Sequence, residues 1–189
     1  MSATYDERFG PAEIARRVQE IGKRISAEFP GDQELVLIAV LKGAAFFVAD
    51  LARAIQRSVR LEYIDVIRSG HEEEIVDFHF VTNFRVAGCD VVILKDVIRS
   101  GIIESYLMDQ LREQRPRSIR FGCLVDRPQE RKSSLLVDYV LFPSEEGHLV
   151  GYGMAFGGQW GNLPLIGQLR TAEPDPFDQT RTGRIRMKA

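Results

Sequence analysis

Residues 91–101, VVILKDVIRSG, contain a β-branched apolar run that leads directly into an Arg-Ser-Gly turn. Helical spacing follows the turn, with apolar residues along one face of residues 103–111. A buried strand that ends in a polar turn and opens a helix is typical of a parallel α/β sheet. Backbone N–H groups at such a junction, together with the helix dipole, favour an anion. The segment therefore predicts an α/β fold and a candidate phosphate site at Arg99, Ser100 and Gly101.

The alternation of strand and helix patterns extends over most of the chain. Apolar residues recur at helical spacing after Pro11, a continuous apolar run covers 34–41, and helical spacing returns over 44–55. Further runs with the composition of strands lie at 61–67, 75–81, 90–94, 120–125 and 136–142. Strands that alternate with helices predict a mostly parallel sheet covered on both faces, with ligands bound beyond the carboxyl ends of the strands.

Composition and charge limit the class of protein. With 189 residues, 44% hydrophobic and 28% charged, the chain fits a soluble globular protein of one domain, expected over 1–170. A net charge of −2 and the lack of a long apolar run argue against nucleic-acid and membrane partners. Two isolated cysteines, Cys89 and Cys123, and an N-terminus without an apolar leader favour the cytoplasm. Residues 171–189 are expected to form a mobile or partner-bound tail, the alternative being a phosphate-binding arm.

The hexapeptide DVIRSG occurs twice, at 65–70 and at 96–101. The sequences that flank the two copies differ, which argues against an internal structural repeat. We therefore interpret them as two loops that border one pocket. Arg99 would offer phosphate a bidentate, permanently charged partner and Ser100 a hydroxyl donor. The alternative is that Ser100 only caps the helix and Arg99 is solvated.

Five segments resemble the hypoxanthine-guanine phosphoribosyltransferase family and come in the family's order. They are LKG at 41–43, VVILKDVIRSG at 91–101, LVDRP at 124–128, LVGYG at 149–153 and NLPLIG at 162–167. The resemblance implies a type I phosphoribosyltransferase fold, with a parallel-rich sheet, flanking helices and a small hood built from the terminal segments. It also implies a homo-oligomer, a dimer or tetramer, and purine salvage: a purine base and phosphoribosyl pyrophosphate give a nucleotide and pyrophosphate, with Mg²⁺.

The resemblance assigns the phosphate-binding positions residue by residue. Lys42 and Gly43 correspond to a turn that binds pyrophosphate in the family. Ser100 and Gly101 fit the cradle for the 5′-phosphate, and Arg99 lies beside them. These residues are therefore candidates for holding a phosphoribosyl ligand.

The resemblance also assigns a base subsite and a lid. Arg127 replaces a lysine that contacts the exocyclic oxygen of the purine, and a guanidinium can donate the same hydrogen bond. His148 and Leu149 occupy the base-stacking and backbone-contact positions. Arg68 and Ser69 stand where the family's flexible loop carries Ser-Tyr.

The acidic positions of the family are largely replaced. Lys95 stands at the first acid of the phosphoribosyl loop, Asp96 keeps the second, and Arg99 stands at the catalytic aspartate. Ala155 replaces an aspartate that helps to hold a second Mg²⁺. Lysine and arginine neither coordinate Mg²⁺ nor accept a proton at neutral pH. The resemblance thus implies Mg²⁺, while these residues leave its ligands undefined.

Two further residues near the expected site have competing interpretations. Asp126 could bind Mg²⁺, but we expect neighbouring loop amides to satisfy its carboxylate. Trp160 either covers a ligand or packs at the rim of the pocket.

Three functions are consistent with these residues. The first is a purine salvage transferase with reduced or retuned activity that uses Asp96. The second is a non-catalytic relative that binds a purine nucleotide or another phosphorylated ligand through Arg68, Arg99 and the Ser100-Gly101 turn. The third is an interaction subunit without a small-molecule ligand.

Overall fold

The computed structural model describes residues 5–69, 74–80, 84–144, 147–170 and 185–187. Three of the strand segments, 67–69, 74–80 and 185–187, are described by their backbone alone. Within these ranges, no helix combines the length and the apolar character that crossing a bilayer requires.

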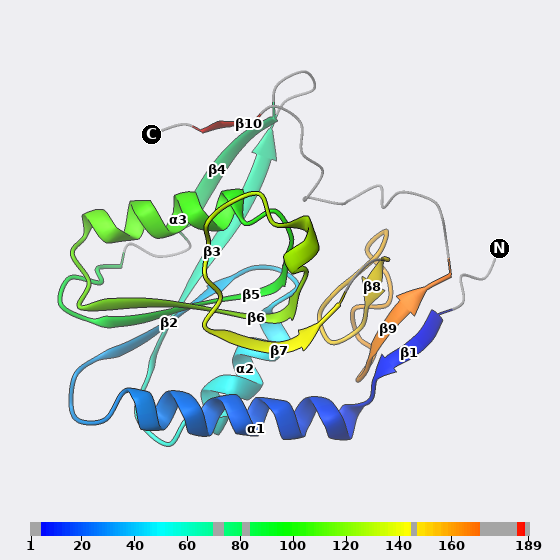
Figure 1. The fold of residues 1–189 in the computed structure, drawn as a ribbon, viewed down its shortest axis with the longest axis horizontal. Helices are drawn as coiled ribbons and strands as arrows, with labels where there is room; N and C mark the ends of the chain where they lie inside the picture. The colour runs from blue at the N-terminus through cyan, green and yellow to red at the C-terminus, as the bar shows by residue number, and fades with distance from the viewer. Residues whose placement is uncertain (1–4, 70–73, 81–83, 145–146, 171–184, 188–189) are drawn as a thin grey trace.

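A seven-stranded sheet forms the centre of the molecule (Figure 1). Its strands, in spatial order, are β10 (Ile185–Met187), β4 (Glu74–Phe80), β3 (Arg60–Ser69), β2 (Leu35–Val40), β5 (Asp90–Ile98), β6 (Ser118–Asp126) and β7 (Tyr139–Pro143). The five strands from β3 to β7 in this order run parallel, β4 pairs antiparallel with β3, and β10 runs parallel to β4. The expected parallel-rich sheet is confirmed.

Helices cover both faces of the sheet because its central strands are apolar on both sides. Leu35, Leu37 and Ala39 of β2 pack in one core cluster with residues of α1 (Pro11–Glu28) and α2 (Ala45–Ala54). The intervening residues of β2 pack in a second cluster with α3 (Ile102–Glu113). Since successive side chains of a strand point to opposite faces, one continuous apolar run is buried by two helical layers.

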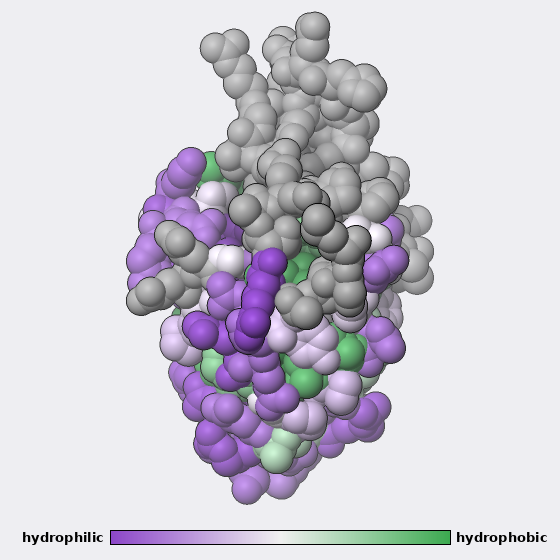
Figure 2. Space-filling model, turned by 90° about the vertical axis from the view of Figure 1, so that its right-hand side faces the viewer, coloured by the Kyte–Doolittle hydropathy of each residue, from purple (hydrophilic) through white to green (hydrophobic). Residues whose placement is uncertain are grey.

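A three-stranded antiparallel sheet forms the expected hood beside the main sheet (Figure 1). Its order is β1 (Tyr5–Phe9), β9 (Ile166–Leu169), β8 (Leu149–Val150), so it joins an N-terminal strand to C-terminal ones. Figure 2 shows the face that carries the hood, where polar side chains surround small, separate apolar areas. The hood places the segment after residue 147 opposite the carboxyl ends of the central strands.

The last parallel strand is shorter than the sequence predicts. The last parallel strand was expected over 136–142, but it begins at Tyr139, and Leu136 is 82% exposed. The pairing with β6 begins at Gly122 and Tyr139, and the apolar residues before Tyr139 are not part of it. The expected tail, 171–189, lies outside the described residues except for β10, whose backbone pairs with β4.

Candidate active site

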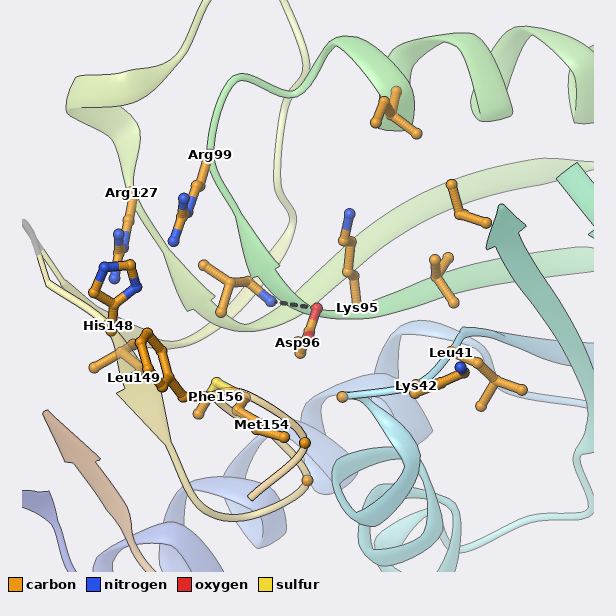
Figure 3. Close-up of a pocket in the computed structure, with 18 residues that line it drawn as sticks. Leu41, Lys42, Lys95, Asp96, Arg99, Arg127, His148, Leu149, Met154 and Phe156 are labelled. Atoms are coloured by element: carbon orange, nitrogen blue, oxygen red, sulfur yellow. Dashed lines mark hydrogen bonds between the residues drawn. The ribbon is translucent and has the colours of Figure 1, made fainter. Parts of the chain in front are cut away.

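A cavity of about 420 Å³ opens where the carboxyl ends of β2, β5 and β6 face the hood (Figure 3). Lys42 and Gly43 line it from the turn after β2, Asp96 and Arg99 from the end of β5, and Arg127 from the end of β6. The hood contributes residues that include His148, Leu149, Met154 and Phe156. The structure therefore brings together predicted residues that are more than one hundred positions apart in the chain.

The turn after β2 lies against the end of β5. The Leu41–Lys42 peptide bond is cis, and the N–H of Leu41 donates to the carbonyl of Ile64 at 2.8 Å. Gly43 lies so close to Asp96 that a Cβ at this position would collide with Oδ2 of the carboxyl. Glycine is therefore required sterically, while the side chain of Lys42 stays exposed at the mouth of the cavity.

Both carboxyl oxygens of Asp96 lie close to backbone atoms. Oδ1 accepts a hydrogen bond from the N–H of Val97 at 2.7 Å, and Oδ2 faces Gly43. Burial raises the pKa of this carboxyl, and the charge of Lys95 lowers it only in part. The one acid that the phosphoribosyl loop retains thus sits where its charged form is disfavoured.

Lys95 points away from the cavity centre toward α3 (Figure 3). Its Nζ lies 2.5 Å from Oε1 of Glu104, and only 14% and 6% of the two side chains are exposed. Glu104 therefore offsets the positive charge that Lys95 brings to the position of the family's first acid. Sequence reasoning missed Glu104, which lies nine positions away across the strand-to-helix turn.

Arg99 and Arg127 enter the same end of the cavity, next to His148 (Figure 3). Arg127 is only 3% exposed, donates to the carbonyl of Gly147, and has Nη1 3.3 Å from Oε1 of Glu130. The side chain of Arg99 lines the cavity and is partly exposed, so it lies where the phosphate-binding interpretation requires, and that interpretation stays a prediction. Two guanidinium groups therefore converge on the predicted base subsite.

The Ser100-Gly101 turn joins β5 to α3 but does not itself line the cavity, although Arg99 does. Gly101 has a φ of 73°, and its carbonyl accepts the N–H of Ser105 at 2.9 Å, which starts the helix. The hydroxyl of Ser100 lies 3.5 Å from the N–H of Ile102, at the limit of a hydrogen bond, so helix capping alone is a weak explanation for Ser100. A positive φ explains why glycine stands at the start of the helix.

The segment after β6 packs across this turn. The N–H of Lys132 donates to the carbonyl of Ser100 at 2.9 Å, and Nη1 of Arg131 donates to the carbonyl of Arg99 at 3.1 Å. Arg131 also pairs with the carboxylate of Asp126. The expectation that loop amides satisfy Asp126 is therefore incomplete, because the guanidinium of Arg131 pairs with its carboxylate.

The hood supplies an aromatic wall to the cavity. His148 meets Phe156 edge to face, with ring centroids 5.1 Å apart. Leu149 is nearly buried beside them. Phe156 was not predicted from the sequence, since its signal is a single aromatic in a glycine-rich segment. Trp160 packs edge to face on Tyr5 at 5.9 Å, which supports the interpretation of a rim residue.

The predicted lid lies only partly within the described residues. The backbone of Arg68 and Ser69 belongs to β3, where these residues pair with Val76 and Ile75 of β4. Their side chains lie outside the description, so their role stays a prediction.

Comparison with known proteins now adds to this geometry. Residues 11–156 match the sequence model of the phosphoribosyl transferase domain. The hypoxanthine-guanine phosphoribosyltransferase of Bacillus subtilis is 34% identical over 167 residues, which cover 85% of this chain and 90% of that protein. The chain belongs to the hypoxanthine-guanine phosphoribosyltransferase family. The enzyme of that name from Mycobacterium avium is 33% identical over 175 residues, covering 88% and 85% of the two chains.

Solved structures of hypoxanthine-guanine phosphoribosyltransferases confirm the fold. The crystal structure of such a protein from Bacillus anthracis has a TM-score of 0.81 at 30% identity and covers 89% of this chain and 99% of that one. A hypoxanthine phosphoribosyltransferase from Trypanosoma cruzi has a TM-score of 0.82 at 29% identity, covering 90% and 93%. This chain is a hypoxanthine-guanine phosphoribosyltransferase-like protein of purine salvage.

Hypoxanthine-guanine phosphoribosyltransferases are in general Mg²⁺-dependent, yet the residues of this chain do not fit a protein-held ion. Among the described residues, no three His, Cys, Asp or Glu side chains come together. Lys95 and Arg99 cannot ligate a cation, Ala155 has no donor atom in its side chain, and Asp96 has one oxygen already engaged by the N–H of Val97. We therefore derive no step of the chemistry through Mg²⁺.

Asp96→Asn is expected to leave the protein at least as stable as the parent at pH 7. The raised pKa means that the folded protein holds this proton more tightly than the unfolded chain. Stability contributed by the protonated form is therefore lost as pH rises from about 4 through the folded pKa, and the asparagine variant does not lose it. Urea unfolding at pH 7 and pH 3.5 measures the difference, which should shrink at the lower pH. A variant clearly less stable at pH 7 would show that the charged carboxylate stabilises the fold.

Proposed function

We propose that this protein binds a purine base and phosphoribosyl pyrophosphate in the 420 Å³ cavity and joins them into a nucleotide, with release of pyrophosphate. The observation that supports this best is the convergence of the Lys42-Gly43 turn, the end of β5 and the hood residues on one cavity. A cavity of this size lined by apolar walls and a few convergent polar groups is typical of a small-molecule site.

The phosphoribosyl ligand would lie along the carboxyl ends of β2 and β5. Lys42 and Gly43 would bind its pyrophosphate, with the exposed ammonium of Lys42 as the cation. Ser100 and Gly101, which lie next to the cavity lining at the N-terminus of α3, would hold the 5′-phosphate where it reaches beyond Arg99, because backbone N–H groups and the helix dipole favour an anion there. Asp96, between the two turns, would face the ribose.

The base would lie between β6 and the hood. Arg127 would donate to an exocyclic oxygen of the ring, which suits its buried and anchored guanidinium. The ring would pack against His148 and Phe156, and the backbone of Leu149 would contact its edge. Aromatic and imidazole rings at this separation form a wall that accepts a planar ligand.

The chemistry at the base is proposed to be retuned and slower than is usual for the family. Arg99 stands where the catalytic aspartate is expected, and a guanidinium cannot take a proton from the base. The same substitution favours a second candidate function, a non-catalytic protein that binds a purine nucleotide through Arg99 and the Ser100-Gly101 turn.

Nucleotide formation from phosphoribosyl pyrophosphate with hypoxanthine or guanine, assayed with Mg²⁺ at high protein concentration, is the direct test. We expect product, and we expect Asp96→Asn to lower kcat/KM by roughly 10²-fold, as loss of one electrostatic contact at a reacting centre does. Arg112→Ala, on the exposed side of α3, is the matched control and should leave the rate unchanged.

Absence of product over many hours would reject turnover of these bases. Stabilisation by a purine nucleotide, about 2.7 kcal/mol at a hundredfold its dissociation constant, would then favour the binding function. If neither product nor stabilisation is found, the remaining function is that of an interaction subunit without a small-molecule ligand.

We also propose the wider setting of this function by analogy with the family. The protein would act in the cytoplasm as a homo-oligomer, a dimer or tetramer. Residues 1–170 would form the ligand-binding domain with its hood, and 171–189 a C-terminal tail. Size-exclusion chromatography with light scattering would measure the oligomeric state.

A further inference from the structure

The end of the cavity assigned to the base is cationic. Of the described residues that line the cavity, Lys42, Lys95, Arg99 and Arg127 are basic, and Asp96 alone carries a carboxyl group. Asp96 lies beside Gly43, on the side of the β2 turn, whereas Arg99 and Arg127 lie at the opposite end with His148 (Figure 3). Charge is therefore divided along the cavity.

Arg99 and Arg127 determine the charge at the base end of the cavity. The charge of Lys95 is offset by Glu104, and Lys42 lies at the exposed turn. Arg127 is held in place by the carbonyl of Gly147 and by Glu130, whose partly exposed carboxylate lies 3.3 Å from Nη1 and offsets part of the charge. A guanidinium has five N–H donors in a rigid fork, so one that already has a protein partner keeps donors for a ligand.

A neutral purine would create an electrostatic problem here. When its ring nitrogen bonds to C1′ of the ribose, the ring gains positive charge, which a carboxylate at the position of Arg99 would offset. Arg99 instead adds a second positive charge at that place. Asp96, the one described carboxyl that lines the cavity, has Oδ1 engaged by Val97 and Oδ2 against Gly43, so it is not placed to receive a proton from the ring.

We infer that the base subsite selects a ring that is already anionic, a nitrogen heterocycle deprotonated at the working pH, with Arg99 and Arg127 as the residues that determine this specificity. The inference deepens the proposed function and rests on it, because it names the substrate class of the same cavity. An anionic ring between two guanidinium groups gains charge-assisted hydrogen bonds that a neutral ring lacks.

The anionic ring also removes the need for a carboxylate. The lone pair of a ring nitrogen forms the bond to C1′ while the bond from C1′ to the pyrophosphate oxygen breaks, and pyrophosphate leaves with that electron pair. The ring passes from a net charge of −1 to neutral as the bond forms, so this step needs no proton transfer. Arg99 holds the anion throughout and transfers no proton.

Competition between xanthine and hypoxanthine tests the inference, because the xanthine ring ionises near neutral pH and the hypoxanthine ring stays neutral there. We expect kcat/KM for xanthine to exceed that for hypoxanthine by roughly tenfold to a hundredfold, the range of a hydrogen bond to a charged group. The ratio should rise with pH as xanthine ionises. Arg99→Asp should reverse the preference, and Arg99→Gln should remove its pH dependence.

Two controls separate the specificity from general damage. Arg112→Asp makes the same charge reversal on an exposed side chain of α3 and should leave the ratio unchanged. Arg99→Lys keeps the charge without the fork and should retain a reduced preference for xanthine. Thermal melts of every variant establish that each is folded before the ratios are compared.

The possible outcomes distinguish this inference from the proposed function. Turnover of hypoxanthine or guanine as fast as xanthine overturns the inference and leaves the transferase function standing. If no base is turned over, the transferase function fails, and calorimetry with phosphoribosyl pyrophosphate present decides the inference. Tighter binding of xanthine that Arg99→Asp abolishes then supports it, whereas equal binding or none overturns it.

Discussion

Lys95→Met and Glu104→Met, each made alone, are expected to lower the free energy of unfolding by roughly 3–5 kcal/mol. Each substitution leaves one buried charge without its partner, since the two side chains are only 14% and 6% exposed. The double variant Lys95→Met/Glu104→Met should recover most of this loss, because an apolar pair of similar volume replaces the ion pair without a desolvation cost. Urea unfolding of the parent, the two single variants and the double variant completes the thermodynamic cycle.

The exposed pair of Arg112 and Asp109 on the same helix is the matched control. Its side chains are 60% and 67% exposed, so removal of either should change stability by no more than about 1 kcal/mol. Additive losses in the Lys95/Glu104 cycle would contradict the prediction and would mean that the two charges are solvated independently. The expected coupling, in contrast, would establish that Lys95 acts as a structural cation rather than as a ligand of phosphate.

Gly43→Ala is expected to lower ligand binding or turnover by roughly 10²-fold, the usual effect of displacing a reacting group by about 1 Å. The new Cβ would collide with Oδ2 of Asp96 and lie 2.8 Å from its Cγ. The backbone of Gly43 cannot retreat toward the hood, because its carbonyl oxygen already lies close to Gly153. The end of β5 must therefore move, and the Ser100-Gly101 turn moves with it. Binding of phosphoribosyl pyrophosphate, measured by calorimetry, gives the loss directly.

Two further variants identify the cause of that loss. Gly88→Ala introduces a Cβ that meets nothing within 4 Å and should leave binding unchanged, although its positive φ costs some stability. Asp96→Ala in the Gly43→Ala background removes the colliding atoms and should restore stability without restoring turnover. If Gly43→Ala binds as the parent does, the turn after β2 is not a ligand-binding element.

Local patterns in the sequence predicted most of the fold. The apolar spacing after Pro11 predicted α1 and its first residue correctly. The continuous apolar run of β2 predicted a strand that is buried on both faces. The resemblance to the family implied the hood and the pocket. These features are predictable because hydrophobic periodicity and turn residues act over a few positions. The predicted start of β7 was wrong because Leu136 is apolar, like the residues of the strand, but lies exposed in the loop before it.

The partners of charged residues were not predictable in the same way. Glu104 offsets Lys95 and Arg131 pairs with Asp126, yet in each case the two residues are joined by a turn whose path no periodic pattern describes. Phe156 reaches His148 only because the hood folds back over the main sheet. A charge pair depends on side-chain direction and on burial, and both are set by elements that pack from elsewhere in the chain.

The sequence by itself determined the α/β architecture, the family, and the residues at which the family's acids are replaced. The tertiary structure alone decided what those replacements mean. It turned Lys95 toward α3 and into an ion pair, and it placed Arg99 beside Arg127 at the base end of the cavity. The physical reason is that local spacing specifies which segments become strands and helices, whereas the effect of a charge depends on its distance to other charges and on its access to water.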